Sequence, residues 1–142
     1  MFPSRGGNRI LNLWAWHQSA AGHTPRTVEQ RVKFIRSLAA SSGRDDPADL
    51  DAADLIRYLS RDLSPWSKRT YFMHARAWFR WLRDQGYNET DLTARLPVPK
   101  APRVVPRPFA TSVLLRAIQT AGPRTSAYLI LAAFGGLRAC MK

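Results

Sequence analysis

Apolar residues recur at helical spacing in several stretches of the chain, and no stretch alternates apolar and polar residues as a half-buried β-strand does. This pattern predicts an all-α fold. The first helix is expected to end before Gly22, and its apolar positions are Ile10, Leu11, Leu13, Trp14 and Trp16.

The next stretch, "TPRTVEQRVKFIRSLAASSG", carries a clear helix start. Thr24 can cap the helix, and Pro25 suits the first helical position, where its missing N–H costs nothing. The apolar stripe consists of Val28, Val32, Ile35 and Leu38, and Ser41, Ser42 and Gly43 end the helix. The polar residues expected on the other side of this helix are Arg26, Gln30, Lys33 and Ser37.

A second stretch, "SPWSKRTYFMHARAWFRWLRDQGY", repeats this design, with Ser64 as the cap and Pro65 at the first helical position. Gly86 is expected to end the helix. Its apolar stripe is Phe72, Ala75, Phe79 and Leu82, widened by Tyr71 and Trp78. The residues mainly off the stripe are Ser67, Arg69, Thr70, Met73 and His74.

Between these two helices lies an acidic stretch that contains six of the ten acidic residues. Asp51 is expected to cap a short third helix, and Asp54 lies in its first turn, where the helix dipole favours negative charge. The acidic stretch is expected to be solvated and to face away from any polyanion.

Half of the ten prolines fall between Pro97 and Pro108, which favours an extended, semi-rigid linker. The alternative is a proline-rich ligand for an aromatic groove, but helical patterns lie on both sides. After it, a short helix is expected around residues 113–118. Another begins at Tyr128, and because it is apolar on nearly every side it is expected to be buried.

The formal net charge of the 142 residues is +12, which indicates a polyanionic partner, and nucleic acid is the commonest one. Every acidic residue lies between Glu29 and Asp91, whereas from Thr93 onward all charged residues are cations. An apolar content of 45% argues against disorder, and no apolar run approaches a membrane span. With no signal peptide and a lone Cys140, a cytoplasmic location is expected.

The two capped helix starts are the strongest candidates for binding chemistry. A helix N-terminus presents free N–H groups to phosphates, and side chains of its first turn can reach base edges in the major groove. No common metal or nucleotide motif is present, and no cofactor or metal is expected. The tryptophans are expected in the core, apart from Trp66, which lies in a polar first turn. Of the histidines, His74 is the one expected near DNA.

These segments, together with "DPADLDAADLIRYLS" and "ARLPVPKAPRVVPRPF", resemble in order and spacing the N-terminal part of tyrosine recombinases, the phage-integrase family. The resemblance implies a SAM-like four-helix core-binding domain at 1–92, a linker at 93–109 and the start of a catalytic domain at 110–142. It also implies binding of double-stranded DNA, possible assembly with other recombinase protomers on DNA, and roles in DNA recombination and integration. The implied DNA contacts are Arg26, Thr27, Gln30, Lys33, Trp66, Ser67, Lys68, Arg69, Thr70, His74, Lys100 and Arg103.

In "AYLILAAFGGLRAC", Arg138 matches the arginine with which the family holds the scissile phosphate. The family's later lysine, its His-x-x-Arg pair and its nucleophilic tyrosine lie downstream of that arginine, so the chain is expected to bind DNA without cleaving it. Two other functions stay open: a stand-alone, non-catalytic DNA-binding regulator, and a helical protein-interaction module.

Overall fold

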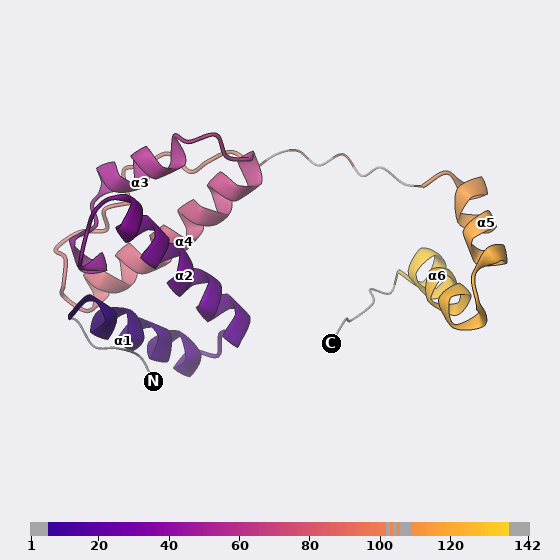
Figure 1. The fold of residues 1–142 in the computed structure, drawn as a ribbon, viewed down its shortest axis with the longest axis horizontal. Coiled ribbons are helices and arrows are strands. Elements are labelled where there is room, and N and C mark those ends of the chain that lie inside the picture. The colour runs from indigo at the N-terminus through magenta and orange to yellow at the C-terminus, as the bar shows by residue number, and fades with distance from the viewer. Residues whose placement is uncertain (1–5, 102, 104, 106–108, 137–142) are drawn as a thin grey trace. The chain divides into compact units, whose positions relative to one another are not determined.

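The computed structural model describes residues 6–101, 103, 105 and 109–136, which form six α-helices, one short 3-10 helix and no strand (Figure 1). The predicted all-α fold is therefore confirmed. The elements are α1 (Gly6–Ala20), α2 (Pro25–Ser41), η1 (Pro47–Asp49), α3 (Ala52–Leu59), α4 (Pro65–Asp84), α5 (Thr111–Thr120) and α6 (Pro123–Gly135).

The chain divides into two compact units, residues 1–102 and residues 103–142. Helices α1 to α4 lie in the first unit, whereas α5 and α6 lie in the second. The division falls inside the segment 93–109, which the sequence predicts as a linker. The first residues of that segment nevertheless pack on the first unit, because Thr93 is buried and Leu96 contacts its core.

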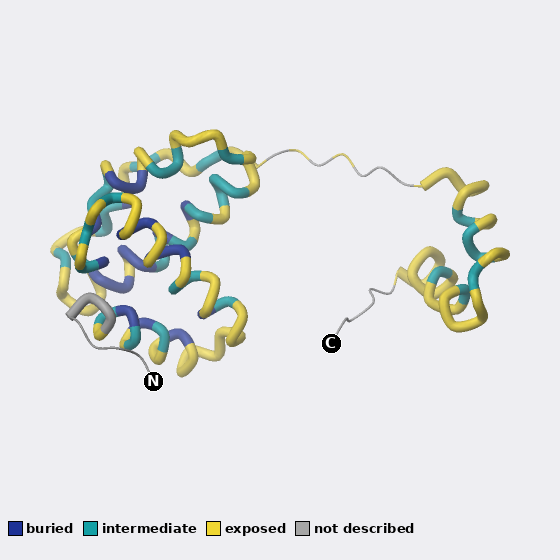
Figure 2. Tube along the Cα trace, viewed as in Figure 1, coloured by how far each residue is buried: buried dark blue, intermediate teal, exposed yellow. Residues whose placement is uncertain are grey.

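The core of the first unit is built from the apolar faces of α1, α2, α3 and α4 (Figure 2). Two tryptophans lie at its centre: the rings of Trp14 and Trp78 meet edge to face with centroids 5.0 Å apart. The indole N–H of Trp78 donates to the carbonyl of Pro47 at 3.3 Å, so this large side chain leaves no polar atom unpaired. Burial of each such side chain contributes roughly 1.5–3 kcal/mol.

The predicted stripes of α2 and α4 lie in this core, apart from Val32 and Tyr71, which are half-buried at its edge. After α4, Gly86 has a φ of 78°, a conformation that residues with a Cβ rarely adopt. Gly86 follows the end of α4, as the sequence predicts, and lets the chain reverse. The following residues run back over α3 toward the start of α4 (Figure 1).

Trp16 does not lie in the core, contrary to the prediction for the tryptophans; 68% of its surface is exposed. The reason is geometric: Trp16 follows Trp14 by two positions, which places the two side chains on nearly opposite sides of α1. Trp66 is 52% exposed, as its polar first turn predicts.

The prediction that the apolar sixth helix is buried is also wrong for the described residues. In α6, Tyr128, Leu131 and Phe134 are each about half exposed or more. Helix α5 is the element it packs against, and the Ser126 hydroxyl bonds the Ile118 carbonyl at 2.6 Å. Two short helices cannot cover each other's apolar surface on all sides, so no residue of either helix is buried.

The acidic stretch is not uniformly solvated, because Asp54 is only 3% exposed. Its carboxylate accepts a hydrogen bond from Arg44 Nε at 3.0 Å and from the backbone N–H of Asp51 at 3.2 Å. Asp51 in turn accepts from the N–H of Asp54 at 2.8 Å, which completes a capping box at the start of α3. Asp54 is therefore a structural residue.

Candidate nucleic-acid interface

Helices α2 and α4 begin in the same way. The hydroxyl of Thr24 accepts a hydrogen bond from the N–H of Thr27 at 3.3 Å, and that of Ser64 accepts from the N–H of Ser67 at 3.1 Å. A second contact of 2.9 Å joins the two hydroxyls in each pair. Neither helix has an acidic residue in its first turn. The positive end of each helix dipole is therefore not neutralised by a neighbouring side chain.

The two helices pack against each other, and both begin at the same side of the first unit (Figure 1). A cavity of 350 Å³ opens between α2, α3 and α4. Four of the residues that the sequence predicts as DNA contacts line it: Gln30, Lys33, Thr70 and His74. The other lining residues are Phe34, Ser37, Tyr58 and Tyr71.

Aromatic rings form much of the cavity wall. Phe34 and Tyr71 stack with ring centroids 4.9 Å apart, and Tyr58 meets Phe34 edge to face at 5.6 Å. The hydroxyl of Tyr58 lies 3.4 Å from that of Ser37. The sequence pattern did not identify Tyr58 as part of this site, because it comes from α3 and nothing near it in the sequence indicates that it faces α2.

The predicted contact residues differ in their exposure. Those on the surface are Arg26, Gln30, Lys33, Trp66, Thr70, Lys100 and Arg103. Those that are half-buried are Thr27, Ser67, Lys68, Arg69 and His74. Arg138, the predicted phosphate-binding arginine, lies outside the described residues.

Arg69 is engaged within the protein. Its Nη1 donates to the carbonyl of Pro99 at 3.1 Å, which joins α4 to the segment after it. This guanidinium is therefore not simply a free group on the surface of α4.

His74 is held in an environment that disfavours its charged form. Burial lowers the pKa of its imidazole from the usual value of 6.5, and the positive charge of Arg31 lowers it further. Its Nδ1 is buried and has no hydrogen-bond partner among the described residues. His74 is therefore a neutral group in the cavity wall at neutral pH.

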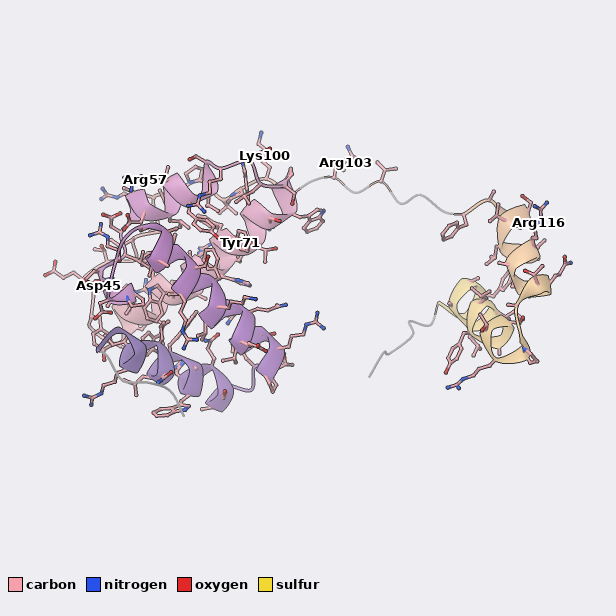
Figure 3. All side chains as sticks on the ribbon, viewed as in Figure 1. Asp45, Arg57, Tyr71, Lys100, Arg103 and Arg116 are labelled. Carbon is pink, nitrogen blue, oxygen red and sulfur yellow. The ribbon has the colours of Figure 1, made fainter. Side chains whose placement is uncertain are left out.

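Ion pairs among the described residues lie mainly away from this face. Arg44 pairs with Asp54 at 3.0 Å, and Arg80 lies 3.7 Å from Asp91. Lys33 and Lys100 take part in no ion pair with a described residue. Asp45 lies at the opposite edge of the first unit from Lys100 (Figure 3). At Lys33 and Lys100, positive charge is therefore not paired with a described acidic residue.

Other site chemistry is limited in the part of the chain that the structure describes. No group of His, Cys, Asp and Glu side chains there could hold a metal ion, and none of the described helices has the length and apolar character to cross a bilayer. Residues His23 to Arg26 have the spacing His-x-x-Arg, but they precede Arg138 and form the start of α2, so they do not match the family's pair.

The fold and this face define an all-helical protein with a basic surface built on two helix N-termini. No protein-family model matches the chain. It is 28% identical over 130 residues to the tyrosine recombinase XerC of Xanthomonas campestris pv. campestris strain B100, a match that covers 85% of this chain and 40% of the relative. Two other strains of the same organism contain XerC sequences that match equally.

Among solved structures, the integrase from mycobacterium phage Brujita matches with a TM-score of 0.66 and 33% identity. The match covers 92% of this chain and 46% of that integrase, so the chain spans less than half the length of either kind of relative. Both comparisons agree with the resemblance seen in the sequence. The chain is therefore similar in sequence and in fold to tyrosine recombinases and phage integrases.

Proposed function

We propose that this chain binds double-stranded DNA through the face formed by α2 and α4, as part of a tyrosine recombinase. The observation that carries this proposal is that α2 and α4, which have no acidic residue in their first turns, together line a cavity with Gln30, Lys33 and Thr70. The net charge of +12 and the similarity to recombinases and an integrase support it.

Each part of the face has a separate task in this proposal. The positive dipole ends of α2 and α4 attract phosphates, and Arg26, Lys33 and Lys68 neutralise the phosphate charge. Gln30 and Thr70 have the amide and hydroxyl groups that can bond base edges in the major groove. Trp66 and Ser67 lie in the first turn of α4 and complete the contact there. Lys100 adds a positive charge to the first unit, and Arg103 adds one at the beginning of the second.

The domain assignment belongs to the same proposal: residues 1–92 form the core-binding domain, 93–109 the linker and 110–142 the start of a catalytic domain. Arg138 would neutralise charge on the scissile phosphate, because a guanidinium stays protonated and binds two phosphoryl oxygens at once. Strand cleavage also needs a nucleophile and acid–base partners. The 142 residues are proposed to bind DNA without cutting it.

The dependence of duplex affinity on salt tests this function directly. With about 6–8 phosphate contacts, the logarithm of the binding constant should fall against the logarithm of salt concentration with a slope of roughly −5 to −7. Fluorescence anisotropy with a labelled duplex measures the slope, and a denaturing gel of the same samples detects any cut strand. A flat salt response would remove the basis of the proposal, and a cut strand would refute its non-catalytic part.

A further inference from the structure

The chain between α4 and the second unit is anchored to the first unit at successive points. We name residues 91–100 the return segment, because they lead from the far end of α4 back to its beginning (Figure 1). At the first anchor, a carboxylate oxygen of Asp91 accepts hydrogen bonds from the N–H and the hydroxyl of Thr93, at 2.9 Å and 2.6 Å. The other oxygen of Asp91 lies 3.7 Å from Arg80 Nε on α4.

The second anchor is apolar, and beyond it the packing becomes loose. Leu96 is half-buried against the core. The residues after it line a cavity of 430 Å³ together with Ile56, Leu59 and Phe72. Val98 is 44% exposed, so little apolar contact holds this end of the return segment in place.

Hydrogen bonding at this end depends on carbonyl groups. Pro97 and Pro99 have no N–H and cannot donate, although they keep the backbone extended. The carbonyl of Pro99 accepts from Nη1 of Arg69 at 3.1 Å, across 30 positions of sequence. A bond with a charged donor is stronger than one between neutral groups. This contact is the last anchor before the chain leaves the unit.

We propose that Arg69 is a positioning residue that fastens the end of the return segment to the first turns of α4, and that it thereby places Lys100 beside the start of that helix. Figure 3 shows Lys100 at this end of the unit, with Arg103 further along the chain. The role assigned to Arg69 differs from direct base reading, because its guanidinium bonds the protein's own backbone. The placement of a DNA-contacting Lys100 rests on the proposed function, whereas the fastening itself does not.

Limited digestion with trypsin tests the fastening without DNA. Trypsin cuts after Lys100 only when the neighbouring residues detach from the unit, and the cut after Arg103 serves as the internal reference. In Arg69→Ala the cut after Lys100, relative to that after Arg103, should become about 10-fold faster or more, because a bond with a charged donor is lost. Mass spectrometry of the fragments over time gives both rates.

The matched control is Lys68→Ala, which removes one positive charge from the adjacent position and no bond to the return segment. In this control, the rate of the cut after Lys100 relative to that after Arg103 should equal the value for the unchanged protein. An unchanged ratio in Arg69→Ala, or an equal rise in Lys68→Ala, overturns the fastening. The cut after Lys33, inside α2, reports opening of the whole unit. If that cut also becomes faster in Arg69→Ala, the same comparison is made with Arg69→Met, which keeps an apolar stem of similar length and removes the donor to Pro99, and its ratio decides in the same way.

Duplex binding then separates positioning from base reading. If Arg69 acts by placing Lys100, Arg69→Ala should weaken binding to all duplex sequences alike, and adding Lys100→Ala to it should weaken binding little further. If Arg69→Ala instead weakens affinity only for duplexes with a particular base pair, and its effect adds to that of Lys100→Ala, Arg69 reads a base and the positioning role is overturned. Absence of duplex binding by the unchanged protein would count against the proposed function alone, since the digestion result does not depend on DNA.

Discussion

Lys33 is the residue whose surroundings point most directly to a phosphate contact. It is exposed, it lines the cavity between α2 and α4, and it pairs with no described acid. A lysine is a compact charge without the geometry for reading a particular base. Its loss should therefore act on every duplex in the same way.

We expect Lys33→Ala to weaken binding about equally for different duplex sequences and to reduce the salt slope by about one unit. Arg83→Ala is the control, because Arg83 pairs with Asp84 at the other end of α4 and should leave the slope unchanged. Anisotropy titrations at several salt concentrations measure both. A loss for one duplex sequence only would mean that Lys33 reads a base.

His74 couples the stability of the first unit to pH. Its pKa is lowered in the folded protein by burial and by Arg31, so below pH 6.5 the unfolded chain binds more protons than the folded one. The groups that face it from the packed elements are Lys33 and Arg31 on α2, Tyr58 on α3 and Tyr71 on α4. Stability from neutral His74 is present above pH 6.5 and is lost as pH falls through its folded pKa.

We expect the free energy of unfolding to decrease between pH 7.5 and pH 5.5, and to decrease less in His74→Phe, which keeps a ring next to Phe34. Urea denaturation at the two pH values measures the change in the free energy of unfolding. The slope of that free energy against pH should differ between the two proteins by no more than one bound proton accounts for. An equal decrease in both proteins would assign the pH dependence to other groups.

At the scale of single elements, α3 depends on one buried carboxylate. Asp54 takes part in the capping box, and its carboxylate accepts a hydrogen bond from Arg44, ten positions earlier in the sequence. Asp54→Ala should lower the free energy of unfolding by about 2 kcal/mol, because a cap and charge-assisted hydrogen bonds are lost together. Asp62→Ala, at an exposed position outside the described ion pairs, should change it by about 0.5 kcal/mol or less. Thermal or urea unfolding checks both values, and equal effects would contradict the structural role of Asp54.

The starts of α2 and α4 are predicted well by the sequence, whereas α6 begins at Pro123 and not at the predicted Tyr128. Thr24 with Pro25, and Ser64 with Pro65, stand at the cap and first positions of α2 and α4 in the structure. A cap is formed by residues within one helical turn of each other, so its partners are adjacent in the sequence. The apolar stripes of both helices are predictable for the same reason, because their spacing follows from helix geometry.

At the scale of the whole molecule, the two units differ in their cores. The first buries large residues from four helices, whereas no residue of α5 or α6 is buried. Isolated helices of this length are marginal in water, and protection against hydrogen exchange follows local stability. Amide hydrogens of residues 111–135 should therefore exchange much faster than those of α2 and α4.

Hydrogen–deuterium exchange with mass spectrometry of the intact chain measures this difference, and peptides from α1 to α4 serve as the internal control. Equal protection in the two units would mean that α5 and α6 gain stability from contacts beyond those between the two helices.

Much of the fold and part of the candidate site could thus be predicted from the sequence. The all-α class, the helix starts and the exposed polar side of α2 follow from residues that are close in sequence. The resemblance to the recombinase family followed from the same segments and is confirmed by the comparisons. The net charge needs no structure at all, since it is a sum over the residues.

Only the tertiary structure decided which of these residues meet. The cavity joins α2, α3 and α4, so Tyr58 became part of it through helix packing that no local pattern encodes. Asp54 is buried because Arg44 reaches it, and Arg69 bonds Pro99 because the chain returns along α4. The spacing of apolar residues predicts which side of a helix is apolar. Contacts between distant segments depend instead on how the helices cross and where the chain turns back. That is why the sequence determined the helices and their charge, and the packing determined the site.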